Sequence, residues 1–152
     1  QTVVNEWGRV SDQFYAREGY ILFRLDNRGS ANRGKKFEDV IYRRTGGPEV
    51  RDQLAGVDWL KAQPYVDGTR IAIQGWSYGG YMTLMTVLQA PKGTFAAAAA
   101  GAPLQEKGKP FELMTYPGQR HGIRGEALQV HLMKTRMAFL ERHLKTDPRK
   151  PS

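Results

Sequence analysis

The sequence contains no cysteine, and this absence removes several classes of chemistry. None of its 152 residues is cysteine, so disulfides, thiolate nucleophiles and cysteine-ligated metal sites are excluded. No apolar run approaches the ~20 residues that a membrane-spanning helix needs. Residues 1–20 contain Glu6, Arg9, Asp12 and Arg17, where a signal peptide would have an apolar core. We therefore expect no membrane span within this chain, and no residue pattern calls for a metal or a cofactor.

Acidic residues are fewer than basic ones, and the formal net charge is +8 with a pI of about 9.9. Such an excess can indicate a polyanionic partner. The basic residues are nevertheless spread along the chain, and acidic residues such as Glu38, Asp39, Glu49 and Asp52 lie among them. No nucleic-acid-binding motif is present. We therefore interpret the charge as a solvated basic face and expect no nucleic-acid partner.

Apolar periodicity and turn residues predict alternating helices and strands. The alanine-rich segment 95–102 has helical propensity, but its shortness and its flanking Gly and Pro residues favour a buried strand. Strands that alternate with helices indicate a single α/β domain around a mostly parallel sheet. Helices are expected at 3–18, 37–42, 48–63, 79–89 and 126–144, and strands at 20–25, 70–74, 95–102 and 111–116.

The segment GWSYGGY, residues 75–81, places Ser77 at G-x-S-x-G spacing. The bare pattern is weak, but here a predicted strand precedes it and a predicted helix follows it, as a nucleophile elbow requires. The glycines allow a tight turn and a close approach of strand and helix. The backbone N–H of Tyr78 would then point toward a developing oxyanion near the helix N-terminus. The pattern favours Ser77 as a nucleophile over an incidental serine in a glycine-rich turn.

A serine hydroxyl needs a base to take its proton, and the chain has three histidines. His131 and His143 fall inside the predicted last helix, off its apolar stripe, and are interpreted as surface residues. His121 follows the predicted strand 111–116 in the loop PGQRHG. A loop at that sheet edge can bring a base to a serine on a neighbouring strand, so His121 is the candidate base.

The third member of a catalytic triad, an acid that orients the imidazole, is missing from its expected place. In this fold class the order is serine, acid, histidine, and only Glu106 and Glu112 lie between Ser77 and His121. Glu106 lies in a Lys- and Gly-rich turn and Glu112 within a predicted strand, so neither follows a strand end. No triad acid is therefore assigned within this chain.

Three motifs taken together resemble one family: DNRGS at residues 26–30, GWSYGGYM at 75–82 and YPGQRHG at 116–122. They are similar to the catalytic domain of prolyl oligopeptidase-family serine peptidases, the dipeptidyl peptidase IV branch in particular. The resemblance implies an α/β-hydrolase fold with helices on both faces of the sheet. It implies Ser77 as nucleophile, His121 as base, and Tyr78 as both an oxyanion donor and a wall of the substrate pocket.

The same resemblance implies a substrate class. Members of this branch release dipeptides from peptides with free N-termini, usually with proline or alanine in second place. An acylaminoacyl peptidase or a carboxylesterase would share the elbow and remains an alternative. The resemblance also allows a homodimer and favours a periplasmic or secreted location, with the cytoplasm as an alternative.

The resemblance runs in two blocks, residues 1–104 and 105–152. In the family several dozen residues separate the counterparts of Leu104 and Gln105, and they carry further strands and the catalytic aspartate. We therefore expect one hydrolase domain that lacks strands and a segment between residues 104 and 105. The chain would then combine segments of a longer peptidase. The alternative is a real internal deletion, which would give a nearly inactive or purely binding hydrolase-fold protein.

Overall fold

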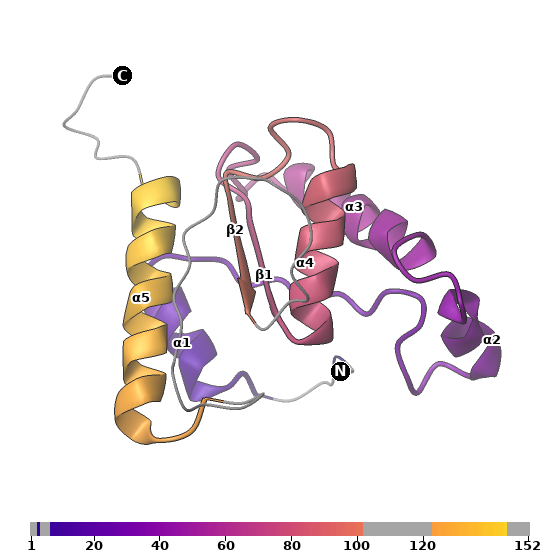
Figure 1. Cartoon of the computed structure of the whole chain (residues 1–152). Helices are drawn as coiled ribbons and strands as arrows, with labels where there is room; N and C mark the ends of the chain where they lie inside the picture. Colours follow the sequence, from indigo (N-terminus) through magenta and orange to yellow (C-terminus); the bar gives the residue numbers. More distant parts are fainter. Residues whose placement is uncertain (1–2, 4–6, 102–122, 146–152) are drawn as a thin grey trace. The chain divides into compact units, whose positions relative to one another are not determined.

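The computed structural model describes residues 3, 7–101 and 123–145 (Figure 1). The chain divides into two compact units, Gln1–Gly68 and Thr69–Ser152. No helix among the described residues is long and apolar enough to cross a membrane. The helices of the first unit are α1 (Val10–Arg17), α2 (Lys35–Glu38), the 3-10 helix η1 (Asp39–Ile41) and α3 (Pro48–Lys61); the second unit contains β1 (Ala72–Trp76), α4 (Tyr78–Gln89), β2 (Ala97–Gly101) and α5 (Glu126–Leu144).

Helix α1 is shorter than the helix expected at 3–18. It begins after Arg9, whose backbone N–H donates to the Asp12 carboxylate at 3.0 Å, so Asp12 fixes the start of the helix. Gly8, directly before it, also disfavours a longer helix, since glycine costs about 1 kcal/mol in a helix interior. The spacing of Val3, Trp7, Val10 and Phe14 predicts one buried apolar face for this helix. That prediction is wrong, because Trp7 and Val10 are 95% and 85% exposed and the buried residue of α1 is Tyr15.

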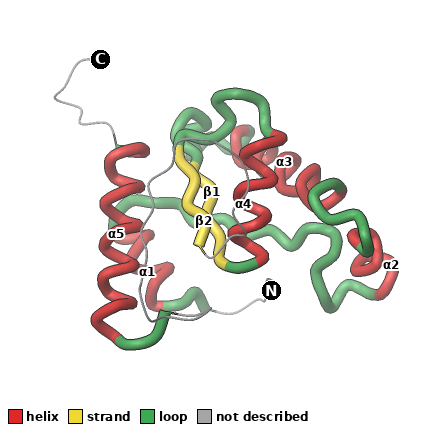
Figure 2. The backbone as a smooth tube through the Cα atoms, in the orientation of Figure 1, coloured by secondary structure: helices red, strands yellow, loops and turns green. Residues whose placement is uncertain are grey.

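Residues 20–25, expected to form a buried strand, are not paired into a sheet in the described part of the chain (Figure 2). The segment instead crosses α3 at Gly56, where an added Cβ would lie 2.7 Å from Leu25 Cδ2. Phe23 stacks on Trp59 of α3 with ring centroids 5.5 Å apart. Some of its apolar side chains thus pack on helix α3, while others are exposed to solvent, such as Ile21 at 58%.

Helix α3 forms where the sequence predicts it. Pro48 is its first residue, where the missing N–H costs nothing. Glu49 is fully buried, and its carboxylate accepts hydrogen bonds from the backbone N–H groups of Gly46 and Gly47 just before the helix. A carboxylate in the first turn also complements the positive end of the helix dipole, so the entry into α3 is fixed by local polar contacts.

The second unit is built on a β–α–β arrangement. Strands β1 and β2 are parallel, with Ala72 opposite Ala97 and Trp76 opposite Gly101. Helix α4 connects them and packs on both. The expected strands are confirmed, although β1 begins two residues later than predicted. The alanine run forms β2, and at its end Gly80 of α4 lies against the Gly101 carbonyl, where an added Cβ would be 2.5 Å from the oxygen.

Helix α5 spans the predicted residues and packs against β2, so that α4 and α5 flank the strand pair (Figure 1). The sequence predicts one apolar stripe on this helix, made by Val130, Met133, Met137, Leu140 and Leu144. The last three of these residues are buried. Val130, which was expected on the same stripe, is 43% exposed. The C-terminal half of α5 therefore provides the packing. The predicted strand 111–116 lies outside the described residues.

Candidate active site

Ser77 occupies a strained turn between β1 and α4. Trp76 ends the strand, Tyr78 begins the helix, and the single residue between them has φ 57° and ψ −119°. A positive φ is uncommon for a residue with a side chain and costs on the order of 1–3 kcal/mol. Such strain persists only where the surroundings enforce it, and a nucleophile elbow is one such place. The backbone geometry thus matches the predicted role of the serine.

Glycines on both sides of Ser77 make this turn possible. A Cβ at Gly75 would collide with the backbone carbonyl of Gly79. A Cβ at Gly79 itself would meet nothing within 4 Å. The close approach of strand and helix therefore depends on Gly75 and Gly80, whereas Gly79 faces open space.

Gly101, at the end of β2, holds the elbow from the neighbouring strand. The Ser77 N–H donates to the Gly101 carbonyl at 2.9 Å, one step beyond the β1–β2 register. The Trp76 ring lies directly against Gly101, where an added Cβ would collide with it. The sequence gives no functional signal for Gly101 beyond a glycine that follows an alanine run.

Tyr78 is the first residue of α4 and is 46% exposed. The first N–H groups of a helix project beyond its N-terminal end, which suits the expected oxyanion role of the Tyr78 N–H. Its ring stacks on Tyr81, one helical turn later, with centroids 5.7 Å apart. An exposed and supported ring next to Ser77 is compatible with a pocket wall.

The candidate base, His121, lies outside the described residues, as do Glu106 and Glu112. The described residues therefore do not test the pairing of Ser77 with His121, which stays a prediction. His131 and His143 are exposed on α5, as expected of surface residues. His143 contacts Phe139, with ring centroids 4.6 Å apart.

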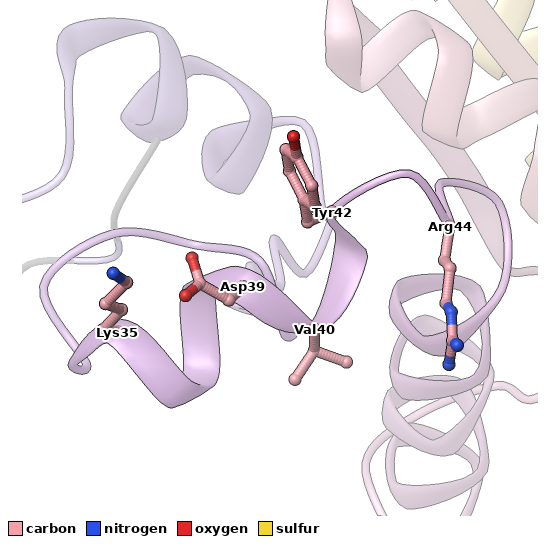
Figure 3. Close-up of a pocket in the computed structure, with 5 residues that line it drawn as sticks. All are labelled: Lys35, Asp39, Val40, Tyr42 and Arg44. Carbon is pink, nitrogen blue, oxygen red and sulfur yellow. The ribbon is translucent and has the colours of Figure 1, made fainter.

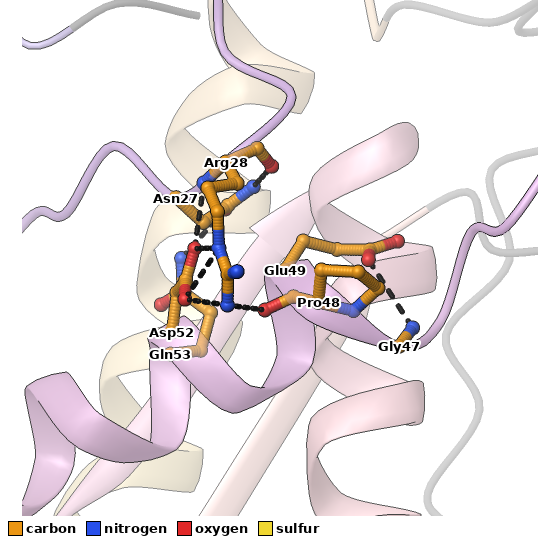
Figure 4. A network of polar contacts seen from close by, with 7 residues as sticks. All are labelled: Asn27, Arg28, Gly47, Pro48, Glu49, Asp52 and Gln53. Carbon is orange, nitrogen blue, oxygen red and sulfur yellow. Dashed lines mark hydrogen bonds and ion pairs between the residues drawn. The ribbon is translucent and has the colours of Figure 1, made fainter. Parts of the chain in front are cut away.

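The DNRGS segment forms a polar network with α3 (Figure 4). The Arg28 guanidinium makes a two-pronged contact with the Asp52 carboxylate, with Nη2–Oδ1 at 2.6 Å, and the Arg28 backbone N–H donates to the same carboxylate at 2.8 Å. The Gln53 side-chain amide donates to the Asn27 side-chain oxygen at 2.8 Å.

The same contacts affect the pKa of Asp52. Burial alone would raise that pKa, but the hydrogen bonds from Arg28 outweigh burial and hold the pKa below its ordinary value. The contacts of Arg28 and Gln53 join the DNRGS segment to α3, which supports a structural role for the network.

A cavity of about 650 Å³ in the first unit is lined by Lys35, Asp39, Val40, Tyr42 and Arg44 (Figure 3). Its described lining offers charged side chains but neither a serine nor a histidine, and it does not include Ser77. Among the described residues, no group of three or more His, Asp and Glu side chains could hold a metal ion.

Comparison with known proteins gives consistent matches. The model of the prolyl oligopeptidase family matches residues 9–104 and 102–147. Dipeptidyl peptidase 8 of Mus musculus is 44% identical over 87 residues, which cover 57% of this chain and 10% of that protein. A protein named probable dipeptidyl-aminopeptidase B, from Trichophyton verrucosum, is 42% identical over 103 residues, which cover 66% of this chain and 12% of that protein.

A solved structure agrees with these relatives. The crystal structure of a candidate dipeptidyl aminopeptidase IV from Bacteroides ovatus superposes with a TM-score of 0.60 at 47% identity, covering 64% of this chain and 14% of that one. The chain spans about a tenth of the length of the curated relatives it matches. The matches, the β1–Ser77–α4 elbow and the parallel strands agree on an α/β-hydrolase fold. The chain belongs to the prolyl oligopeptidase family of serine peptidases.

Proposed function

We propose that the protein carrying this chain is a serine exopeptidase that releases N-terminal dipeptides, with proline or alanine preferred in second place. The observation that carries the proposal is the backbone of Ser77, strained at φ 57° between a strand and a helix. The names of the relatives, dipeptidyl peptidase and dipeptidyl-aminopeptidase, support the reaction type.

In the proposed reaction the Ser77 hydroxyl oxygen attacks the carbonyl carbon of the second substrate residue. His121 takes the hydroxyl proton and passes it to the departing amine as the C–N bond breaks, which leaves an ester on Ser77. Water then attacks the ester carbonyl carbon and gives a proton to His121, which passes it to the Ser77 oxygen as the ester bond breaks and the dipeptide leaves. The Tyr78 N–H stabilises the oxyanion, and the exposed Tyr78 ring borders the pocket.

The direction of α5 supports His121 as the base. Arg70, just before β1, donates to the Leu144 carbonyl at the end of α5 at 3.3 Å. At the other end of β1, the Arg136 guanidinium lies 5.7 Å from the centroid of the Trp76 ring. Helix α5 therefore runs antiparallel to β1, so that its N-terminal end lies toward the end of β1 that leads into Ser77 (Figure 1). His121 precedes that start by five residues, Glu126 being the first of α5.

The triad acid is proposed to lie in a segment that separates Leu104 from Gln105 in the intact protein. A serine–histidine pair without its acid loses about 10⁴-fold in kcat, equivalent to about 5.5 kcal/mol of barrier. A hydrolase-fold protein without catalytic activity is therefore the second candidate, favoured by the absence of an assignable acid between Ser77 and His121 in this chain.

The test is hydrolysis of Gly-Pro-p-nitroanilide by the intact protein, compared with its Ser77→Ala and Ser11→Ala variants. Ser77→Ala should lower kcat at least about 10⁴-fold, while Ser11→Ala, on helix α1, should leave the rate unchanged. Cleavage of N-blocked peptides or esters, but not of this amide, would move the assignment to an acylaminoacyl peptidase or an esterase. No reaction of Ser77 with a fluorophosphonate would favour the inactive alternative.

A further inference from the structure

Arg136, in the middle of α5, contacts the residue that precedes the nucleophile. Its guanidinium carbon lies 5.7 Å from the centroid of the Trp76 ring. This is within the ~6 Å at which a cation is attracted to an aromatic face, and tryptophan is the best such partner. Both residues are half-buried, so water screens the attraction less than at an open surface.

The Trp76 ring is itself part of the elbow's support. It lies against Gly101, and the carbonyl of that same glycine accepts the Ser77 N–H at 2.9 Å. The ring and the Ser77 amide are thus held on one residue of β2. A shift of the ring would disturb the Ser77–Gly101 hydrogen bond and, with it, the strained φ of Ser77.

The contact also joins two parts of the chain that are far apart in sequence. Arg136 stands on α5, whose buried residues Met137, Leu140 and Leu144 all lie in its C-terminal half. Arg136 directly precedes the first of them, and so lies near the N-terminal limit of the buried part of the helix. The contact between Arg136 and Trp76 therefore holds α5 beside the end of β1, next to the Ser77 turn.

We propose that Arg136 is a positioning residue for the nucleophile elbow. Through the Trp76 ring it holds the Ser77 turn on Gly101 and fixes α5 relative to that turn. The kinetic consequence rests on the proposed function, since it requires Ser77 to be the nucleophile and His121 its base. The consequence for the backbone at Ser77 does not.

The experiment uses the intact protein and three variants. Arg136→Met keeps most of the side-chain volume and removes the cation, Arg136→Lys keeps a cation, and Lys134→Met removes a charge from an exposed position of the same helix. The first readout is amide hydrogen exchange of the segment that contains Ser77. The second is kcat and KM for Gly-Pro-p-nitroanilide, with fluorophosphonate labelling of Ser77 as a measure of its reactivity.

Arg136→Met should speed exchange at Ser77 and lower kcat, each by about tenfold, with KM within a factor of about two, because misalignment affects the transition state more than substrate binding. Arg136→Lys should recover most of both effects, and Lys134→Met should show neither. Equal exchange and equal kcat in Arg136→Met and Lys134→Met would overturn the proposal. The proposal would also be overturned if Arg136→Lys lowered kcat and sped exchange as much as Arg136→Met does, because the positive charge would then not be what positions the turn.

The two proposals fail separately. If the wild-type protein neither cleaves the substrate nor reacts with the fluorophosphonate, the proposed function fails, and exchange at Ser77 still decides whether Arg136 holds the elbow. If the wild-type protein is active and exchange at Ser77 is the same in Arg136→Met and Lys134→Met, the positioning role of Arg136 fails alone.

Discussion

Two glycines of the GWSYGGY motif stand in opposite surroundings although they are four residues apart. A Cβ at Gly75 would meet the backbone of Gly79, which cannot move without shifting α4, whereas a Cβ at Gly79 would meet open space. We expect Gly75→Ala to lower the free energy of unfolding by about 3 kcal/mol, the upper end of the cost of overpacking. Gly79→Ala should be neutral or raise it by up to about 1 kcal/mol, because alanine favours the helix.

Denaturant unfolding of the intact protein with both variants provides the measurement, and each variant serves as the control for the other. Both are alanines introduced into one motif, so a general effect of added volume would act on both alike. Similar destabilisation by the two substitutions would contradict the asymmetry of the turn described here.

At the residue scale, the sequence could predict Ser77 but not the residues that support it. The serine is found because G-x-S-x-G, a β-rich segment and a helical segment are contiguous, and contiguous signals need no knowledge of the fold. The contacts of Gly101 and Arg136 with the elbow join residues 24 and 60 positions away from Ser77 and Trp76 respectively. No local pattern encodes such pairings, so they became visible only in the structure.

At the element scale, the contact of Arg28 with Asp52 ties the turn that follows residues 20–25 to helix α3 (Figure 4). The pKa of Asp52 is lowered in the folded state: burial opposes the shift, and the hydrogen bonds from Arg28 outweigh it. A carboxylate with a depressed folded pKa stabilises the fold above its unfolded pKa of about 3.9. That stabilisation is lost as the pH falls through the folded value.

Asp52→Asn should therefore reduce the denaturation midpoint of the protein at pH 7, and its deficit relative to wild type should shrink as the pH falls below about 4. Asp58→Asn is the matched control, since Asp58 is an exposed residue of the same helix. Urea unfolding at a series of pH values between 7 and 3 measures both. A deficit of Asp52→Asn that stays constant down to pH 3 would show that the ionised carboxylate is not what holds the turn.

The elements that the sequence predicted well are those whose signals are local. Helix α3 has its proline at the first position, and α5 ends where its apolar stripe ends. The strand predicted at residues 20–25 is wrong in the described structure. An apolar, β-rich run predicts burial, but it does not say whether a neighbouring strand is available for hydrogen bonding. Here the segment packs on Gly56 and Trp59 of α3 instead.

At the scale of the whole molecule, the bond between Leu104 and Gln105 distinguishes segments of a longer peptidase from a protein with an internal deletion. The family model matches residues 9–104 and 102–147 as two stretches that overlap at residues 102–104, directly beside the junction between the two blocks expected from sequence. The sheet of the described residues has two strands, fewer than the five or six that are typical of a sheet. We therefore expect further strands and the triad acid to come from a segment that separates Leu104 from Gln105 in the intact protein.

Trypsin digestion of the native protein tests this expectation directly. If Leu104 were bonded to Gln105, cleavage after Lys92 and Lys107 would release the peptide GTFAAAAAGAPLQEK, residues 93–107. We expect mass spectrometry to find instead a peptide that begins GTFAAAAAGAP and continues with other residues. The peptide IAIQGWSYGGYMTLMTVLQAPK, residues 71–92, should appear in either case and controls for recovery. Detection of the intact 93–107 peptide would show that Leu104 is bonded to Gln105. The serine–histidine pair would then lack an acid from an intervening segment, and we would expect a kcat lower by about 10⁴-fold.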